Sequence, residues 1–295
     1  MIIVNLKGGL GNQMFQYACG RALFLRNAAK DTNGFAEYTG PKLDCTGFAS
    51  AMKSDTPRKY ELDGWDIVAD TAWPNEIRKV KYPFGIFSKA ARFFRAKVLK
   101  RYYINFVPSV LSLSGDVYLD GFFQDERYFK DFADDIRLAF TPKNPLSPKS
   151  QAWINRIYSD ESSVSLHVRR GDYTTTASAE FVSLEPSYYA SALAHIRTLV
   201  PNPHVYVFSD DIAWAKANIA LPSDAEFVSD PKTPLFEEIF LMSACRHNII
   251  ANSSFSWWGA WLNANPDKVV VAPKAWAKRH ESWYKDIIPP TWIRL

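Results

Sequence analysis

Cysteine is scarce in this 295-residue sequence, and its placement excludes two structural uses of the residue. The three cysteines are Cys19, Cys45 and Cys245, and none belongs to a C-x-x-C pair. An odd number of isolated cysteines argues against both a disulfide framework and a structural zinc site. We therefore expect a protein of a reducing compartment that is held together by its hydrophobic core.

Long hydrophobic runs and targeting signals are also missing. No run reaches the roughly 18 apolar residues that a membrane-spanning helix needs. The first residues, MIIVNLKGGLGNQ, lack a basic region followed by an apolar one, so they do not resemble a secretion signal. These absences predict a cytoplasmic protein.

Charge is close to balanced, with 35 Lys and Arg against 31 Asp and Glu. A net charge of +4 without a concentrated basic motif argues against nucleic acid as a partner. Residues 78–103 are the exception, because they contain nine Lys or Arg, no acidic residue and seven aromatic residues. This segment is either an amphipathic helix with a solvated basic face or a peripheral contact with the inner face of an anionic membrane.

Apolar runs alternate with helical patterns along the chain, which indicates an α/β fold with parallel sheets. Residues 1–6 form a predicted strand, followed by the turn KGGLGN and a helix with apolar residues at helical spacing. The other expected strands are 164–168, 205–208, 248–251 and 269–272, and the other expected helices are 188–199, 212–218, 236–244 and 257–264.

A segment with three prolines, TPKNPLSP at 141–148, divides these elements into two groups. Prolines without apolar periodicity favour a linker or hinge. We predict a Rossmann-like domain at 1–145, a second one at 146–275, and a tail at 276–295 that adds no strand and packs back on the protein.

Four polar motifs follow the ends of predicted strands, where open α/β sheets bind ligands. The first is the glycine turn 8–13, in which Gly9 and Gly11 permit close backbone approach. The amides of Asn12 and Gln13 stand at the loop tip, available to a ligand. The turn is either a tight structural connection or an anion site at the start of a helix.

The second motif is HVRRGDY at 167–173. Arginine is a planar, permanently charged donor, so Arg169 and Arg170 suit a diphosphate. Strand alternation places His167 and Arg169 on one face and Arg170 on the other, so one arginine meets the phosphate directly. The alternative for Arg170 is an ion pair with Asp172 that holds the loop.

The third and fourth motifs carry carboxylates and hydroxyls. FSDD at 208–211 offers carboxylates to ribose hydroxyls or a guanine edge, with helix capping as the alternative for one of them. NSSFSWWGAWL at 252–262 offers hydroxyls and backbone N–H groups for a second phosphate cradle, and Phe255 to stack on a base. The tryptophans at 257, 258 and 261 have the helical spacing typical of a core.

The D-x-D pattern with which many sugar transferases hold a metal-bound nucleotide is absent. Arginine and helix-end amides must then neutralise a diphosphate leaving group. We therefore expect neither a metal nor another cofactor.

Together the motifs GGLGNQMFQYA, HVRRGDY, FSDD and NSSFSWWGAWL resemble those of the bacterial α-1,2-fucosyltransferases of glycosyltransferase family 11. The resemblance extends over nearly the whole chain and implies a GT-B architecture, with two Rossmann-like domains facing a cleft. It implies that the C-terminal domain binds GDP-β-L-fucose and that the N-terminal domain is on the acceptor side. The implied reaction is metal-free, inverting transfer of fucose to the 2-hydroxyl of a terminal galactose in an oligosaccharide, in surface glycan (O-antigen) synthesis.

The resemblance also implies roles for single residues. Arg169 neutralises the β-phosphate, with His167 near the ribose or base, and Asn12 faces the reacting centre from the other domain. The remaining implied donor-binding residues are Gly9, Gly11, Asp210, Asp211, Ser253, Ser254, Phe255 and Ser256.

A carboxylate within reach of the acceptor hydroxyl would act as the general base. Asp172 and Glu180 are the candidates, with Asp172 preferred and a structural role as its alternative. The related α-1,6 enzymes carry a glutamate ten residues after the motif histidine, and this sequence departs from them with Ala177. The competing hypotheses are a transferase with another GDP-sugar donor, such as GDP-mannose, and a non-catalytic nucleotide-sugar or glycan-binding protein.

Overall fold

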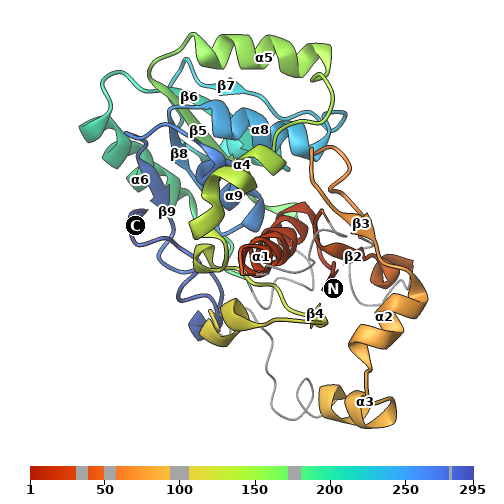
Figure 1. The fold of residues 1–295 in the computed structure, drawn as a ribbon. Coiled ribbons are helices and arrows are strands. Elements are labelled where there is room, and N and C mark those ends of the chain that lie inside the picture. Colours follow the sequence, from red (N-terminus) through yellow and green to blue (C-terminus); the bar gives the residue numbers. More distant parts are fainter. Residues whose placement is uncertain (31–38, 50–57, 94–105, 172–180, 279–280) are drawn as a thin grey trace. The chain divides into compact units, whose positions relative to one another are not determined.

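The computed structural model describes residues 1–30, 39–49, 58–93, 106–171, 181–278 and 281–295. The chain forms two compact units, Met1–Thr141 and Pro142–Leu295, and the division falls inside the proline-rich segment (Figure 1). Each unit is built around its own parallel sheet.

Unit 1 contains a four-stranded parallel sheet in the order β3-β2-β1-β4. The strands are β1 (Ile2–Asn5), β2 (Lys42–Asp44), β3 (Asp70–Thr71) and β4 (Val117–Leu119). The helices are α1 (Leu10–Ala28), α2 (Pro74–Lys81), α3 (Ile86–Phe93) and α4 (Ala133–Ala139), with short 3-10 turns at Thr46–Ala49, Pro108–Ser112, Glu126–Tyr128 and Lys130–Phe132. The predicted strand at 1–6 and the helix after it are confirmed.

Helix α1 packs directly on β1, and a glycine permits the close approach. A Cβ at Gly20 would lie 2.3 Å from a methyl carbon of Val4, so any side chain there would push the helix off the sheet. Buried aromatic rings complete this core, in which Tyr17 and Trp65 both make edge contacts with Phe140. This packing fixes the glycine turn between β1 and α1.

Unit 2 contains a six-stranded parallel sheet in the order β10-β9-β8-β5-β6-β7. The strands are β5 (Ser163–Val168), β6 (His204–Ser209), β7 (Glu226–Phe227), β8 (His247–Ile249), β9 (Val270–Ala272) and β10 (Ile293–Arg294). The helices are α5 (Pro148–Tyr158), α6 (Pro186–Leu199), α7 (Ile212–Asn218), α8 (Leu235–Ala244) and α9 (Ser254–Leu262), with a 3-10 turn at Glu281–Trp283. Counted from β5, this is the 3-2-1-4-5-6 order of a Rossmann fold, and the order in unit 1 matches its 3-2-1-4 part, so the predicted α/β class with two Rossmann-like domains is confirmed.

The prediction that residues 276–295 add no strand was wrong. The tail supplies β10, which pairs in parallel with β9 at the edge of the sheet. A strand of two residues is too short to show the alternation that predicts one, so backbone pairing forms it without a side-chain signal. The tail also packs on α9, because the indole of Trp257 donates to the Ile287 carbonyl and lies against Trp292.

The basic and aromatic segment is described in part. Helices α2 and α3 cover its first half, and residues 94–103 lie outside the described residues. No helix in the described part of the chain is both long and apolar enough to cross a membrane.

Candidate active site

Three of the polar motifs meet at one edge of the unit 2 sheet. Strands β5, β6 and β8 run parallel, so their carboxyl ends lie at the same edge. The Arg169 guanidinium pairs with Asp210, and the ring of His167 lies 5.7 Å from that of Phe255, between centroids. We call residues 167–171, 209–211 and 253–256 the carboxyl edge.

Asp210 organises the loop after β5. Its carboxylate lies 2.8 Å from Nη1 of Arg169 and accepts the backbone N–H groups of Arg170 and Gly171 at 2.8 and 3.0 Å. The side chains of Arg169 and Asp210 are 25% and 26% exposed, so the guanidinium is accessible to a ligand. A carboxylate with several donors around it orients the guanidinium and balances its own charge locally.

Glycine at position 171 leaves room for this contact, since a side chain there would force the Asp210 carboxylate to move. A Cβ there would lie 2.7 Å from Oδ2 of Asp210, closer than real Cβ atoms approach other atoms. The backbone comes this near because its N–H must reach the carboxylate. The glycine of the HVRRGDY motif therefore serves the Asp210 contact.

Arg170 has different partners. Its guanidinium lies 4.0 Å from the ring centroid of Trp214, and Nη1 donates to the Ser183 hydroxyl at 2.7 Å. Within the described residues, no group hydrogen-bonds to its buried Nε. Asp172, the partner expected in the alternative ion pair, lies outside the described residues.

His167 is a neutral group in this site. It is 3% exposed, and burial together with the Arg169 charge lowers the pKa of its imidazole to about 3. At neutral pH the ring therefore carries one N–H donor and one acceptor nitrogen. Its buried Nδ1 has no hydrogen-bond partner in the part of the chain that the structure describes. A neutral ring of this kind suits a hydroxyl or a base edge better than a phosphate.

Two of the predicted ligand residues cap helices. Asp211 accepts the Trp214 N–H at 2.9 Å and caps α7, which is the capping alternative left open by the sequence. Ser253 accepts the Phe255 N–H at 3.3 Å and caps α9. The positive end of α9 consequently lies at the carboxyl edge, where it favours an anion.

The other residues at the start of α9 differ in exposure. Ser254 and Phe255 are partly exposed, so both are accessible to a ligand. Ser256 is buried, and its hydroxyl points to the carbonyls of Ala251 and Ser253 at 3.5 and 3.4 Å. A ligand at this helix start would meet Ser254 and Phe255 before Ser256.

The sequence interpretation missed one carboxyl near this edge, Glu238 in the first turn of α8. It accepts hydrogen bonds from the Ser229 hydroxyl and the Asp230 N–H, and Ser229 in turn accepts the N–H of Ser209 at the end of β6. Burial raises the pKa of Glu238 to about 7, and the negative charges of Asp210 and Asp230 add to this effect.

A signal for Glu238 existed in the sequence. Two consecutive glutamates lie in the first turn of α8, and Glu237 caps α5 by accepting the N–H and the hydroxyl of Ser147. Successive residues of a helix point in different directions, so Glu238 faces a different part of unit 2 from Glu237.

In unit 1, the side chains of Asn12 and Glu61 lie close to the glycine turn 8–13. Gly8 has a φ of +79°, and a Cβ there would lie 2.5 Å from Nδ2 of Asn12, so this turn needs glycine. The Glu61 carboxylate accepts the N–H of Leu10 at the start of α1. The Glu61 carboxylate and the slightly nearer Arg58 guanidinium therefore both stand near Gly9, where the sequence left open an external anion. Gly11, the other predicted donor residue of this turn, is buried within the first turn of α1.

The two amides of this turn have different surroundings. Asn12 is partly exposed, and its Oδ1 accepts the Gln124 amide at 2.7 Å. Gln13 is fully buried, donates to two backbone carbonyls and accepts the Glu61 N–H at 3.0 Å. The expectation that Gln13 is available to a ligand was wrong, because its amide ties the segment before Glu61 to the turn.

Both candidate general bases, Asp172 and Glu180, lie outside the described residues. Among the residues that the structure describes, no group of three or more His, Cys, Asp or Glu side chains is arranged to hold a metal ion. Metal independence stays a prediction.

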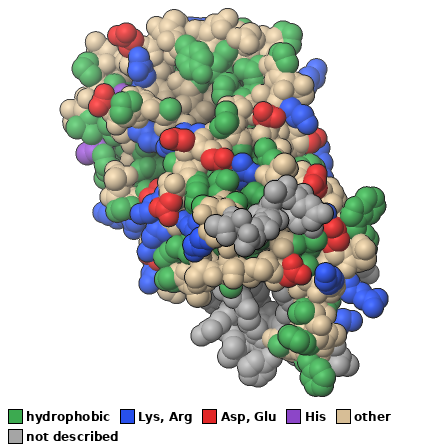
Figure 2. Space-filling view, in the orientation of Figure 1, with side chains coloured by type: hydrophobic (Ala, Val, Ile, Leu, Met, Phe, Trp, Pro, Cys, Tyr) green, Lys and Arg blue, Asp and Glu red, His purple; other side chains and the backbone are tan. Residues whose placement is uncertain are grey.

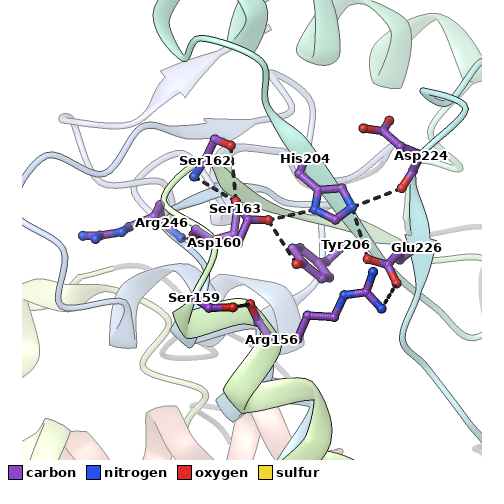
Figure 3. A network of polar contacts seen from close by, with 10 residues as sticks. All are labelled: Arg156, Ser159, Asp160, Ser162, Ser163, His204, Tyr206, Asp224, Glu226 and Arg246. Carbon is purple, nitrogen blue, oxygen red and sulfur yellow. Dashed lines mark hydrogen bonds and ion pairs between the residues drawn. The ribbon is translucent and has the colours of Figure 1, made fainter.

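A second polar cluster lies at the opposite edge of the same sheet, where β5 and β6 begin (Figure 3). Asp160 lies 2.8 Å from Nδ1 of His204 and accepts the Tyr206 hydroxyl at 3.0 Å. Glu226 lies 3.1 Å from Nε2 of His204 and 2.7 Å from Arg156. We call these five residues the amino-edge network.

Known proteins similar to this chain are glycosyltransferases. Residues 95–295 match the model of glycosyl transferase family 11. The chain is 32% identical to an α-1,2-colitosyltransferase of Escherichia coli, over 100% of this chain and 99% of the relative. It is also 32% identical to the O-antigen biosynthesis glycosyltransferase WbnK of Escherichia coli, over 98% of this chain and 99% of the relative.

More distant similarities extend to fucosyltransferases. A galactoside 2-α-L-fucosyltransferase of Caenorhabditis elegans is 27% identical, over 100% of this chain and 79% of the relative. Among solved structures, the NodZ α-1,6-fucosyltransferase soaked with GDP-fucose aligns with a TM-score of 0.44 and 13% identity, over 88% of this chain and 91% of that chain.

Proposed function

We propose a function from one established premise: this chain belongs to glycosyltransferase family 11. The proposed reaction moves L-fucose from GDP-β-L-fucose to the 2-hydroxyl of a terminal galactose, with inversion at the anomeric carbon. The galactoside 2-α-L-fucosyltransferase among its relatives supports this acceptor and linkage. The similarity to an O-antigen biosynthesis glycosyltransferase supports a role in surface glycan synthesis, which we place in the cytoplasm.

The observation that carries this proposal is the accessible Arg169 guanidinium, oriented by Asp210 at the carboxyl edge. As the bond from the anomeric carbon to GDP breaks, negative charge builds on the β-phosphate, and a fixed cation beside it lowers the barrier. The guanidinium fork matches two phosphate oxygens at once. Arg169 is the main electrostatic catalyst of the proposed reaction.

Other residues of the carboxyl edge are assigned by their chemistry. Ser254 and the start of α9 receive phosphate oxygens, because hydroxyl and backbone N–H groups are donors there. Phe255 stacks on the guanine, and the neutral ring of His167 exchanges a hydrogen bond with a ribose hydroxyl or the base. Asp210 positions the Arg169 guanidinium, and Asp211 positions the start of α7 by capping it.

Unit 1 is assigned to the acceptor side. Its partly exposed Asn12 contributes a polar group toward the reacting sugars, and the turn of Gly9 and Gly11 presents that side chain. Asp172 is the proposed general base that takes the proton of the attacking hydroxyl. The reaction needs no metal, because arginine and helix-end N–H groups supply the positive charge.

A second donor is favoured by one specific similarity. A relative that aligns with the whole chain is an α-1,2-colitosyltransferase, and colitose is L-fucose without its 3-hydroxyl. The same carboxyl edge would hold either GDP-sugar, because the nucleotide and diphosphate are identical. The alternative function is therefore α-1,2 transfer of colitose.

The test is a transfer assay with GDP-L-fucose, GDP-L-colitose and GDP-mannose against a panel of β-galactosides in the presence of EDTA, with the product linkage read by NMR. We expect an α-1,2-fucosyl galactoside as the main product. A preference for GDP-colitose would establish the second donor, and a strict manganese requirement would overturn the metal-free reading of the site. Binding of GDP-fucose by calorimetry without transfer to any acceptor would support the non-catalytic alternative.

A further inference from the structure

One surface of unit 1 combines exposed aromatic rings with positive charge. We call it the α2–α3 patch and define it as Trp73, Arg78, Lys79, Phe84, Phe87 and Lys89. Phe84 and Phe87 are each 78% exposed, and Trp73 is 70% exposed. Figure 2 shows hydrophobic and basic side chains together over α2 and α3. Large apolar groups gathered at a surface mark an interaction site more often than scattered ones do.

The patch has one sign of charge. Residues 77–93 contain five Lys or Arg and no Asp or Glu. The acid just before them, Glu76, is committed within unit 1, because it pairs with Lys42 and accepts the Trp73 N–H. Phe84 and Phe87 are therefore flanked in the sequence by basic residues and by no acid, whereas Trp73 stands between the exposed Asp70 and the paired Glu76.

Helix α2 holds the patch to the sheet. Ile77 and Val80 are buried in a cluster with Tyr118 of β4, and Lys81 donates to the Tyr118 hydroxyl at 2.9 Å. The opposite face of α2, with Arg78 and Lys79, is exposed. Arg78 and Lys79 therefore stand on a fixed support.

We propose that the α2–α3 patch docks on the surface of an anionic bilayer. The aromatic rings enter the boundary between headgroups and acyl chains, while Lys and Arg stay at the level of the lipid phosphates. A basic helix with a solvated face, the other interpretation of this segment, does not require two exposed phenylalanines. A negatively charged leaflet accommodates the rings and the charges together, and its attraction to each basic residue adds to the binding. The proposal does not depend on the identity of the sugar donor.

The experiment is co-sedimentation of the full-length protein with vesicles of phosphatidylcholine alone and of phosphatidylcholine mixed with phosphatidylglycerol. We expect at least tenfold more protein on the anionic vesicles at low salt. High salt should remove most of that difference, because it shortens the reach of surface charge to about 3 Å at 1 M.

Two double variants test the two halves of the patch. Phe84→Ser with Phe87→Ser should reduce binding at least tenfold, while Leu199→Ser with Leu235→Ser, which removes exposed leucines of unit 2, should leave it unchanged. Lys79→Glu with Lys89→Glu should abolish the preference for anionic vesicles. Lys143→Glu with Lys232→Glu makes the same change in net charge at exposed sites of unit 2 and should leave the preference largely intact.

Three outcomes would overturn the proposal. One is failure of the wild-type protein to co-sediment with anionic vesicles at low salt. Another is equal loss of binding in both charge variants, since net charge alone would then explain the attraction. The third is a concentration-dependent dimer that the Phe84 and Phe87 variant abolishes in sedimentation velocity, because the rings would then contact a second copy of the chain.

Discussion

The two edges of the unit 2 sheet are built on the same strands, but their polar groups differ in how they are hydrogen-bonded. At the amino edge, Asp160 and Glu226 contact opposite sides of the His204 ring, and both also contact further polar side chains (Figure 3). At the carboxyl edge, the buried Nδ1 of His167 and Nε of Arg170 have no hydrogen-bond partner among the described residues. The buried Oε1 of Glu226 at the amino edge also lacks a hydrogen bond there, but it lies 3.1 Å from Nε2 of His204. An unsatisfied buried polar atom costs free energy, and a bound ligand that supplies its partner would remove that cost. The contrast distinguishes a structural cluster from a binding edge.

The largest expected effect is on catalysis at the carboxyl edge. Arg169→Ala should lower kcat/KM by about 10²–10³, or roughly 3–4 kcal/mol of transition-state stabilisation, because the developing phosphate charge loses its fixed cation. Arg169→Lys should still cost at least about tenfold, since a single ammonium cannot replace the fork. Initial rates at varied GDP-fucose concentration measure both changes.

The control for Arg169 is Arg197→Lys, which alters an exposed arginine of α6 in the same unit. Its kcat/KM and unfolding midpoint should match those of the wild type. Near-normal turnover in Arg169→Lys would contradict the catalytic assignment. A large fall in the unfolding midpoint of Arg169→Ala would show that Arg169 stabilises the fold, as the residues of the amino edge do.

The next effect is on stability at the amino edge. Asp160→Ala should lower the free energy of unfolding by about 2–3 kcal/mol, because His204, Tyr206 and Ser162 lose a shared acceptor. Urea unfolding measures this loss, and calorimetry with GDP should show an unchanged Kd.

Asp224→Ala is the matched control for Asp160→Ala. Asp224 meets His204 through its backbone carbonyl, and its exposed carboxylate points away from the ring (Figure 3). That variant should change neither stability nor binding. A higher Kd for GDP in Asp160→Ala would mean that the two edges are energetically coupled through β5.

The smallest effect concerns pH and Glu238. Its pKa is raised by burial from 4.5 to about 7, so the folded protein binds its proton more tightly than the unfolded chain. This contribution is full below about pH 4.5 and is lost as pH rises through about 7. We therefore compare the free energy of unfolding of Glu238→Gln with that of the wild type at two pH values. The variant should gain about 1–2 kcal/mol on the wild type between pH 5 and pH 8.

The pH measurement compares two proteins, which removes the effect of other titrating groups. His167 changes stability with the opposite sign, because its lowered pKa favours folding at higher pH. Glu237→Gln is the neighbouring control. Burial raises the pKa of Glu237, but the hydrogen bonds from Ser147 outweigh burial, so this pKa lies below its ordinary value. An identical pH dependence in wild type and Glu238→Gln would show that Glu238 is ionised in the folded protein.

The sequence predicted best those parts of the fold whose strands are buried on both faces. The run 163–168 is buried throughout, so its apolar character reveals β5 directly. Strands β3 and β7 are two residues long and are partly or fully exposed, so no hydrophobic pattern distinguishes them from loops. Their positions follow from backbone pairing with neighbours that lie far away in the sequence.

The candidate site was predictable where a motif ends a strand. His167 lies near the end of β5, and Arg169 and Asp210 directly follow β5 and β6, so their meeting follows from the parallel order of these strands. Glu61 and Glu238 reach the two sheets from a loop and a helix. The positions of such residues depend on tertiary packing. Neither residue belongs to a sequence motif that predicts a binding site.

Strand β5 has a consequence for changing the donor by directed evolution. Its six residues are all buried, and its two ends adjoin the amino-edge network and the carboxyl edge. Substitutions along it would disturb folding and function together, and selection would then reward repair of stability over new specificity. A library aimed at a new nucleotide sugar is better spent on Ser254 and Phe255, which are partly exposed at the start of α9, with β5 kept constant.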